Sequence, residues 1–201
     1  MNQKNILSIE KSYEILKEKS LPDFDYYFML LISSIICFFG FKMNSAAVII
    51  GAMVISPLLY SIIGVSTSIL FLDIKQLMKE ILSLILEIGL ILLIIFLLGK
   101  LFEIEISTEI IDRIQGSKID YFLIAFFSGM AGSFSLFWPK IEQSLVGVAI
   151  SVALIPPIVL CGIGLALGDM NILSVSLNIV LVNLFGISFG SLLLLTFLKY
   201  R

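Results

Sequence analysis

The fold is decided by thirty residues without a charge, from Met43 to Leu72, which read MNSAAVIIGAMVISPLLYSIIGVSTSILFL. A straight helix of this length would be about 45 Å long, well over the roughly 30 Å of a bilayer core. Pro57 stands in the middle of the run, where it cannot donate a helical hydrogen bond and crowds the preceding turn. Within lipid, the freed backbone groups are tolerated only where protein or a water-filled cavity satisfies them. The run therefore predicts a membrane span that is interrupted near Pro57.

A second charge-free run, from Gln143 to Gly168, repeats this pattern. Residues 43–68 align on residues 143–168 without gaps, and the pairs that carry the weight are Pro57 with Pro157 and Gly64 with Gly164. Two broken spans placed alike in two halves predict an inverted repeat, because an odd number of spans per half inserts the second half upside down. Chance similarity between hydrophobic segments is the alternative interpretation.

The composition indicates a polytopic membrane protein. Of the 201 residues, 59% are hydrophobic and 14% are charged, which is far more apolar than a soluble domain of this size needs. Histidine is absent and no nucleophile with a base is visible, so the chain is predicted not to be an enzyme. No cofactor, metal site or nucleic-acid partner is predicted. Cys37 and Cys161 lie inside apolar runs and are predicted to be buried thiols.

The fold class predicted is an all-α bundle of six spans in a 3+3 inverted repeat, with two proline-broken helices. A transmembrane domain is predicted over residues 25–201, with repeat 1 over about 25–102 and repeat 2 over about 119–201. Nine Lys and Arg residues fall on the N-terminal side and four on the other side. This bias predicts a multi-pass protein of the cell inner (plasma) membrane with both termini in the cytoplasm. The six segments are Tyr26–Phe41, Met43–Leu72, Ile81–Gly99, Tyr121–Trp138, Gln143–Gly168 and Met170–Leu198.

Residues 1–24 are predicted to form a cytoplasmic amphipathic helix at the membrane surface. Ile6, Ile9, Tyr13 and Leu16 recur at helical spacing, and Pro22 ends the pattern. A solvated, frayed tail is the alternative.

The two proline breaks are the candidate binding site. Ser56 stands beside Pro57, and Ser151 lies just over one turn before Pro156 and Pro157. Half-helix ends that face each other present partial charges to an ion or a polar solute. No charge sits beside either break, and such a neutral lining suits a monovalent cation or an uncharged polar solute. Proline kinks patched by neighbouring serines and water are the alternative.

Four further residues are candidates. Asn44 begins the second segment as a helix cap or a ligand contact, Gly51 allows close helix approach, and Asn183 offers an amide inside the last segment. Glu87 is the one acidic residue well inside a plain span, which makes it a candidate proton site. It lies about 10 Å from the start of its segment, so contact with headgroup water is the alternative. The predicted ion- or substrate-binding set is Asn44, Gly51, Ser56, Pro57, Ser151, Pro156, Pro157 and Asn183.

Three motifs resemble a prokaryotic family of uncharacterised hydrophobic membrane proteins, catalogued as domain of unknown function 389. Residues 44–58, NSAAVIIGAMVISPL, resemble its first signature, and residues 147–157, GVAISVALIPP, resemble its second. Asn183 followed by Leu184 is similar to the polar element of its last helix. The family often has an arginine soon followed by a proline in the central loop, whereas no proline follows Arg113 here. The resemblance implies an integral inner-membrane protein and no agreed activity.

The leading functional prediction is a transporter that moves a small ion or polar solute through a midplane site between the inverted repeats. An oligomeric ion channel and a non-transporting scaffold or sensor are the alternatives. The partners expected are membrane lipid, the small ion or solute, and a second copy of the chain in a homo-oligomer, which the small residues at four-residue spacing permit.

Overall fold

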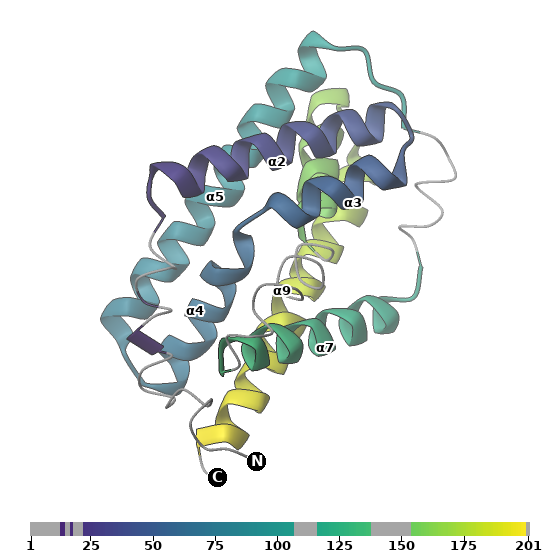
Figure 1. Ribbon diagram of the computed structural model, residues 1–201. Coiled ribbons are helices and arrows are strands. Elements are labelled where there is room, and N and C mark those ends of the chain that lie inside the picture. The colour runs from purple at the N-terminus through teal and green to yellow at the C-terminus, as the bar shows by residue number, and fades with distance from the viewer. Residues whose placement is uncertain (1–12, 15–16, 18–21, 107–115, 138–153, 200–201) are drawn as a thin grey trace.

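The computed structural model of the protein describes residues 13–14, 17, 22–106, 116–137 and 154–199, and this part of the chain is helical with no strand (Figure 1). Helix α2 (Phe24–Lys42) begins at Asp23, whose carboxylate accepts a hydrogen bond from the Tyr26 amide at 2.9 Å. Helix α3 (Ala46–Ile55) turns back beside α2. Asn44 makes the turn with φ of 51°, a left-handed conformation that asparagine tolerates. Ser45 rather than Asn44 caps α3, since its hydroxyl accepts the Val48 amide.

The first charge-free run contains two helices separated by Ser56 and Pro57. Helix α3 ends at Ile55 and helix α4 (Leu58–Leu70) follows, with a bend of 49° between the two axes. Ser56 is extended, at φ −71° and ψ 132°, which is the conformation that a following proline imposes on its neighbour. The change of direction therefore has a local steric cause.

Three helices are long and apolar enough to cross a membrane. They are α2, α5 (Ile74–Leu101, 28 residues) and α9 (Met170–Lys199, 30 residues), and the bent pair α3 and α4 makes a fourth span if it is counted as one. At 1.5 Å per residue, α5 is about 42 Å long and exceeds a bilayer core. The prediction of an all-α membrane protein is confirmed.

Helix α5 is polar where it faces the protein and apolar where it faces outward. Gln76, Glu80, Ser83 and Glu87 are buried, whereas Leu82, Ile85, Leu86 and Leu93 are more than half exposed. A soluble protein has the opposite arrangement. In lipid it is favourable, because polar side chains within the bilayer turn toward the protein interior.

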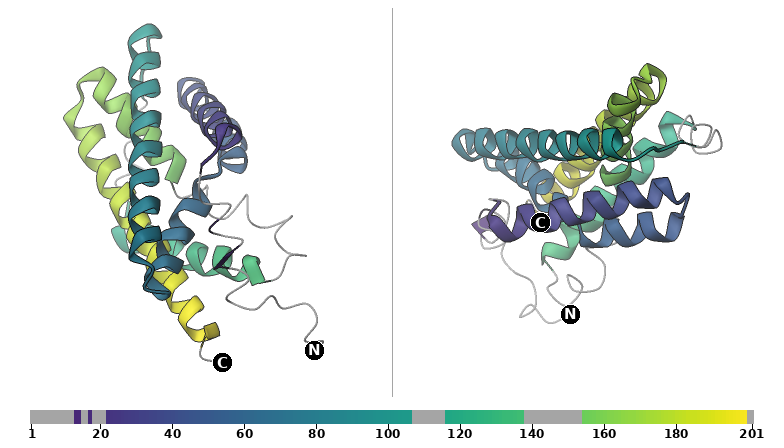
Figure 2. Two further views of the ribbon diagram at one scale, coloured as in Figure 1. Left: turned by 90° about the vertical axis from the view of Figure 1, so that its left-hand side faces the viewer. Right: turned by 90° about the horizontal axis from the view of Figure 1, so that it is seen from above.

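Side-chain contacts with aromatic rings join the described elements near both ends of α5. At the start of α5, Tyr13 stacks on Phe71 with ring centroids 4.4 Å apart, and the Lys199 ammonium lies 4.8 Å from the same Phe71 ring centroid. At the other end, the Lys42 ammonium lies 5.1 Å from the Phe102 ring centroid. Helix α5 rises from the first end and α9 descends toward it, so these two long helices run in opposite directions (Figures 1 and 2).

Glycines set the distance between α7 (Lys118–Phe137) and α9. A Cβ atom at Gly190 would collide with the carbonyl oxygen of Phe126, and one at Gly129 would collide with that of Ile187. The Ser191 hydroxyl donates to the Gly129 carbonyl at 3.1 Å across this contact. Gly162, in the helix Leu154–Leu167, similarly lies against Ile95 of α5. These helices are held at distances that only glycine permits.

Gly190→Ala is expected to destabilise the protein, whereas Gly89→Ala is not. At Gly190 the added methyl group meets backbone, which cannot move aside, and overpacking of this kind costs about 1–3 kcal/mol. At Gly89 nothing lies within 4 Å, and alanine in a helix interior is favoured over glycine by about 0.5–1 kcal/mol. Thermal unfolding of the wild type and both variants in one detergent measures the difference. Equal midpoints for the two variants would contradict the close α7–α9 packing.

Candidate functional site

A line of polar side chains follows the inward face of α5. Gln76, Glu80, Ser83 and Glu87 are spaced by four, three and four residues, which places them on one face of a helix. All four are buried, with exposed fractions between 0 and 5%. We call this set the α5 column. The next two residues on the same face, Ile91 and Ile95, are apolar and fully buried, so the polar face ends at Glu87.

Glu87 lies where α2, α4 and α5 meet. Its Oε1 accepts hydrogen bonds from the Ser83 hydroxyl at 2.7 Å and from the Ser61 hydroxyl of α4 at 2.8 Å. The Tyr26 hydroxyl of α2 lies 2.7 Å from the Ser61 oxygen. Because Ser61 has one proton and gives it to Glu87, Tyr26 is the donor to Ser61. Three helices are thus joined through one carboxyl oxygen.

The second carboxyl oxygen of Glu87 is different. Oε2 is buried and accepts no hydrogen bond from any residue in the described ranges. The ion pair found among these residues, between Lys17 and Asp73, lies elsewhere. A buried carboxylate without a countercharge is very unfavourable. Glu87 is therefore suited to bind a cation or a proton.

The break at Ser56 and Pro57 lies close to a residue of α4 that contacts Glu87. Ser61, which donates to Glu87, comes one turn after Pro57. A change in the bend between α3 and α4 would therefore move a direct partner of Glu87.

Just outside the α5 column lies Asp73, the N-cap residue of α5. The Asp73 carboxylate accepts hydrogen bonds from the Gln76 backbone N–H at 2.9 Å and from the Tyr13 hydroxyl at 3.0 Å. The Lys17 ammonium lies 3.5 Å from the same carboxylate. The hydrogen bond from the Gln76 backbone N–H, and to a lesser extent that from the Tyr13 hydroxyl, holds the pKa of Asp73 below its usual value. Burial, with the Asp73 contact, raises the pKa of Tyr13 to about 12. Inward of this cap, the Gln76 side-chain amide donates to Glu80 at 2.6 Å.

The structure does not gather the predicted binding residues at one point. Asn44 and Gly51 are exposed, whereas Ser56 is buried. Asn44 and Ser56 flank the ten-residue α3 at its opposite ends. Asn183 is 97% buried within α9. Pro156 and Pro157 lie within the described helix Leu154–Leu167. Ser151 and Arg113 lie outside the described residues, as does most of the predicted helix over residues 1–24.

Sequence reasoning singled out Glu87 but missed its partners. Ser61 and Tyr26 contact it from helices that begin 29 and 63 residues before it, and no local pattern joins them. The α5 column could have been predicted from the sequence, because Gln76, Glu80 and Ser83 recur with Glu87 at helical spacing.

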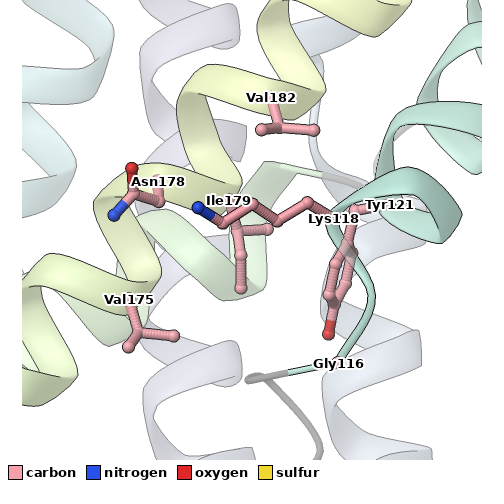
Figure 3. Close-up of a pocket in the computed structure, with 7 residues that line it drawn as sticks. All are labelled: Gly116, Lys118, Tyr121, Val175, Asn178, Ile179 and Val182. Carbon is pink, nitrogen blue, oxygen red and sulfur yellow. The ribbon is translucent and has the colours of Figure 1, made fainter.

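A separate pocket of about 310 Å³ opens between the start of α7 and the middle of α9. The Lys118 side chain extends across it toward Asn178, with Tyr121 on the α7 side (Figure 3). It shares no residue with the α5 column. Cys37 and Cys161 are buried free thiols, as predicted. Among the described residues, no three His, Cys, Asp or Glu side chains are grouped as a metal site would require.

The apolar outer face, polar inner face and span lengths define a helical integral membrane protein. The chain belongs to the family described as Domain of unknown function (DUF389), which matches residues 53–189. The match contains Pro57, Ser61 and all of the α5 column, and it confirms the resemblance seen in the motifs.

The chain is also similar to the uncharacterized protein MJ0678 of the archaeon Methanocaldococcus jannaschii. The two are 29% identical over 188 residues, which cover 92% of this chain and 58% of the archaeal protein. The chain therefore spans little more than half the length of that relative. No solved structure matches it.

Proposed function

We propose that this protein transports a small ion or polar solute across the membrane, and that Glu87 binds the transported or coupling ion. The proposed function includes no catalysed reaction and no cofactor. The proposed site consists of Glu87 with its donors Ser61 and Ser83, next to the break at Ser56 and Pro57.

One observation carries this proposal. Glu87 has an exposed fraction of 0% within the apolar helix α5, and its Oε2 has no hydrogen-bond partner in the described part of the chain. An acidic residue within a membrane span is costly, and such residues are typical of ion and proton pathways. A purely structural role would be served better by a neutral residue, because replacing buried charges with apolar groups is often neutral or stabilising.

The broken helix supports transport rather than a static scaffold. Alternating access needs an element with two arrangements, and interrupted helices at the binding site are common in transporters. The 49° bend between α3 and α4 lies one turn from the Ser61 donor. Straightening or deepening this bend would open or close the path to Glu87.

The inverted repeat is part of the proposal. It is supported by the opposite directions of α5 and α9, which are the last spans of the two halves (Figure 2). It is also supported by the helices that carry the two proline motifs, because α4 of the first half contacts α9 through Ser66 and the helix Leu154–Leu167 of the second half contacts α5 through Gly162. We further propose that both termini lie in the cytoplasm of the plasma membrane and that the chain forms a homo-oligomer.

Reconstitution tests the proposed function. Purified protein in liposomes is assayed for uptake of Na⁺, K⁺, H⁺, amino acids and small polyols, against liposomes without protein. At least one of these solutes is expected to enter faster with the protein, and Glu87→Gln is expected to remove the difference. If no solute enters faster and none raises the unfolding midpoint of the protein, the transporter assignment is wrong.

A further inference from the structure

The geometry around Glu87 points to H⁺ as the ion that it binds, and we propose that the α5 column delivers this proton from the α4–α5 turn. This inference rests on the proposed function and names the ion for it. Gln76 has a positioning role in the proposal, while Glu80, Ser83 and Glu87 carry the proton.

Among the described residues, Glu87 has few oxygen ligands to offer a metal cation. A dehydrated alkali cation is held by several oxygen atoms, as in carbonyl-lined filters. Around Glu87, both hydroxyl donors point their hydrogens at Oε1, and Oε2 has no hydrogen-bond partner among the residues that are described. A proton needs only one carboxylate oxygen, whereas a metal cation bound here would lack the several oxygen ligands that it requires.

The α5 column follows one face of the helix from its first turn to Glu87. From Gln76 to Glu87 it extends eleven residues, or about 16 Å along the helix. Gln76 donates to Glu80 at 2.6 Å and Ser83 donates to Glu87 at 2.7 Å. Glu80 and Ser83 are neighbours at i and i+3, about 5–6 Å apart at their Cβ atoms. Proton-accepting side chains therefore recur along one buried face, as in the carboxylate chains of proton pumps.

The proton balance of the Ser83 step is simple. When the proton that leaves Glu80 arrives at the Ser83 hydroxyl, Ser83 passes its own proton to Oε1 of Glu87. The hydroxyl group is regenerated, no group is oxidised or reduced, and one positive charge has moved inward.

The α5 column leads toward only one end of the helix. Just before its first residue, Gln76, stands Asp73, the N-cap residue of α5, whose pKa the Gln76 backbone N–H holds below its usual value. Beyond Glu87, Ile91 and Ile95 are fully buried and offer no polar group. A proton at Glu87 therefore communicates with the end where Tyr13, Phe71 and Lys199 meet. Release to the opposite side needs a rearrangement, which the α3–α4 bend can supply.

The groups facing Glu87 from each neighbouring helix fit this role. Helix α2 contributes Tyr26 and Tyr27, α5 itself contributes Glu80, and α4 contributes the Ser61 hydroxyl. The helix Leu154–Leu167 packs farther along α5 and carries the buried thiol of Cys161. None of these groups is a cation that would neutralise Glu87 in place of a proton.

The experiment measures proton entry into proteoliposomes that contain a pH-sensitive dye, driven by a K⁺ diffusion potential. Glu87→Gln is expected to reduce the protein-dependent flux to that of empty liposomes. Glu80→Gln is expected to slow it by about a hundredfold or more, the lower end of the range that a positioned proton-transfer group contributes. Glu105→Gln is the matched control, because Glu105 is an exposed carboxylate outside the column, and its flux is expected to stay within about twofold of wild type.

Infrared spectroscopy gives a readout that does not depend on flux. A protonated carboxylic acid has its own carbonyl band, which is expected in the wild type, to change with pH, and to be absent from Glu87→Gln. Equal fluxes for wild type and Glu80→Gln, or a wild-type spectrum without the band, would overturn the inference. If a solute from the uptake panel is transported while proton flux stays at background, the proposed function stands and the proton is the wrong ion.

Discussion

Glu87→Gln is expected to abolish transport while leaving the protein folded. Glutamine has nearly the shape of glutamate, and its carbonyl oxygen can still accept from Ser61 and Ser83, which donate to Oε1 in the wild type. It cannot release or bind a proton, and its amide group replaces the open acceptor Oε2. The transport rate is expected to fall by about a hundredfold or more, which is the lower end of the range for a group that transfers protons.

The unfolding midpoint of Glu87→Gln separates a lost site from a lost fold. Because the carboxyl group is fully buried and glutamine needs no countercharge, the midpoint is expected to equal or exceed that of the wild type. Uptake and thermal unfolding are measured on the same preparation. Normal transport by Glu87→Gln would show that Glu87 is a structural residue. If Glu87→Gln aggregates, Ser83→Ala is measured in its place, because it removes a single hydrogen-bond donor to Glu87.

Pro57→Ala is expected to favour a straight α3–α4 helix and to slow transport. Pro57 lies between the two helices, and a continuous helix through a proline costs about 3 kcal/mol, so alanine allows α3 and α4 to join as one helix. A straight arrangement would fix the position of Ser61 and hold Glu87 in one state. We expect transport to fall by about tenfold, since interrupted helices supply the two arrangements of the site.

Spin labels on the two sides of the break report the bend directly. Ile50 and Ile69 are both exposed, and a continuous helix would place their backbones about 28 Å apart. The distance is expected to be shorter in the wild type and to approach this value in Pro57→Ala. Pro22→Ala serves as the control, because Pro22 lies before the cap of α2. Wild-type transport in Pro57→Ala would show that the break is architectural.

Much of the fold followed from the apolar runs. The segments around α2, α5 and α9 were predicted because a bilayer demands long apolar helices whose backbone groups bond internally. The helix boundary at Ser56 follows from the proline after it, which acts on its immediate neighbour.

The candidate site was only partly predictable. Glu87 was visible as a lone carboxylate in an apolar span, but headgroup water was an equal alternative, and only packing against α2 and α4 shows that the side chain faces the protein. The Ser61 and Tyr26 partners depend on how separate helices pack, which local patterns do not contain. Asn44 was misjudged as a cap because the turn before α3 is one residue longer than the apolar run suggested.

The most direct test of the central claim is the electrical current that follows a rapid pH step across reconstituted protein on a solid-supported membrane. Wild-type protein is expected to give a transient current whose sign follows the proton gradient, and Glu87→Gln is expected to give none at equal protein density. A current of the same size in both proteins would contradict the assignment of Glu87 as the ion-binding residue.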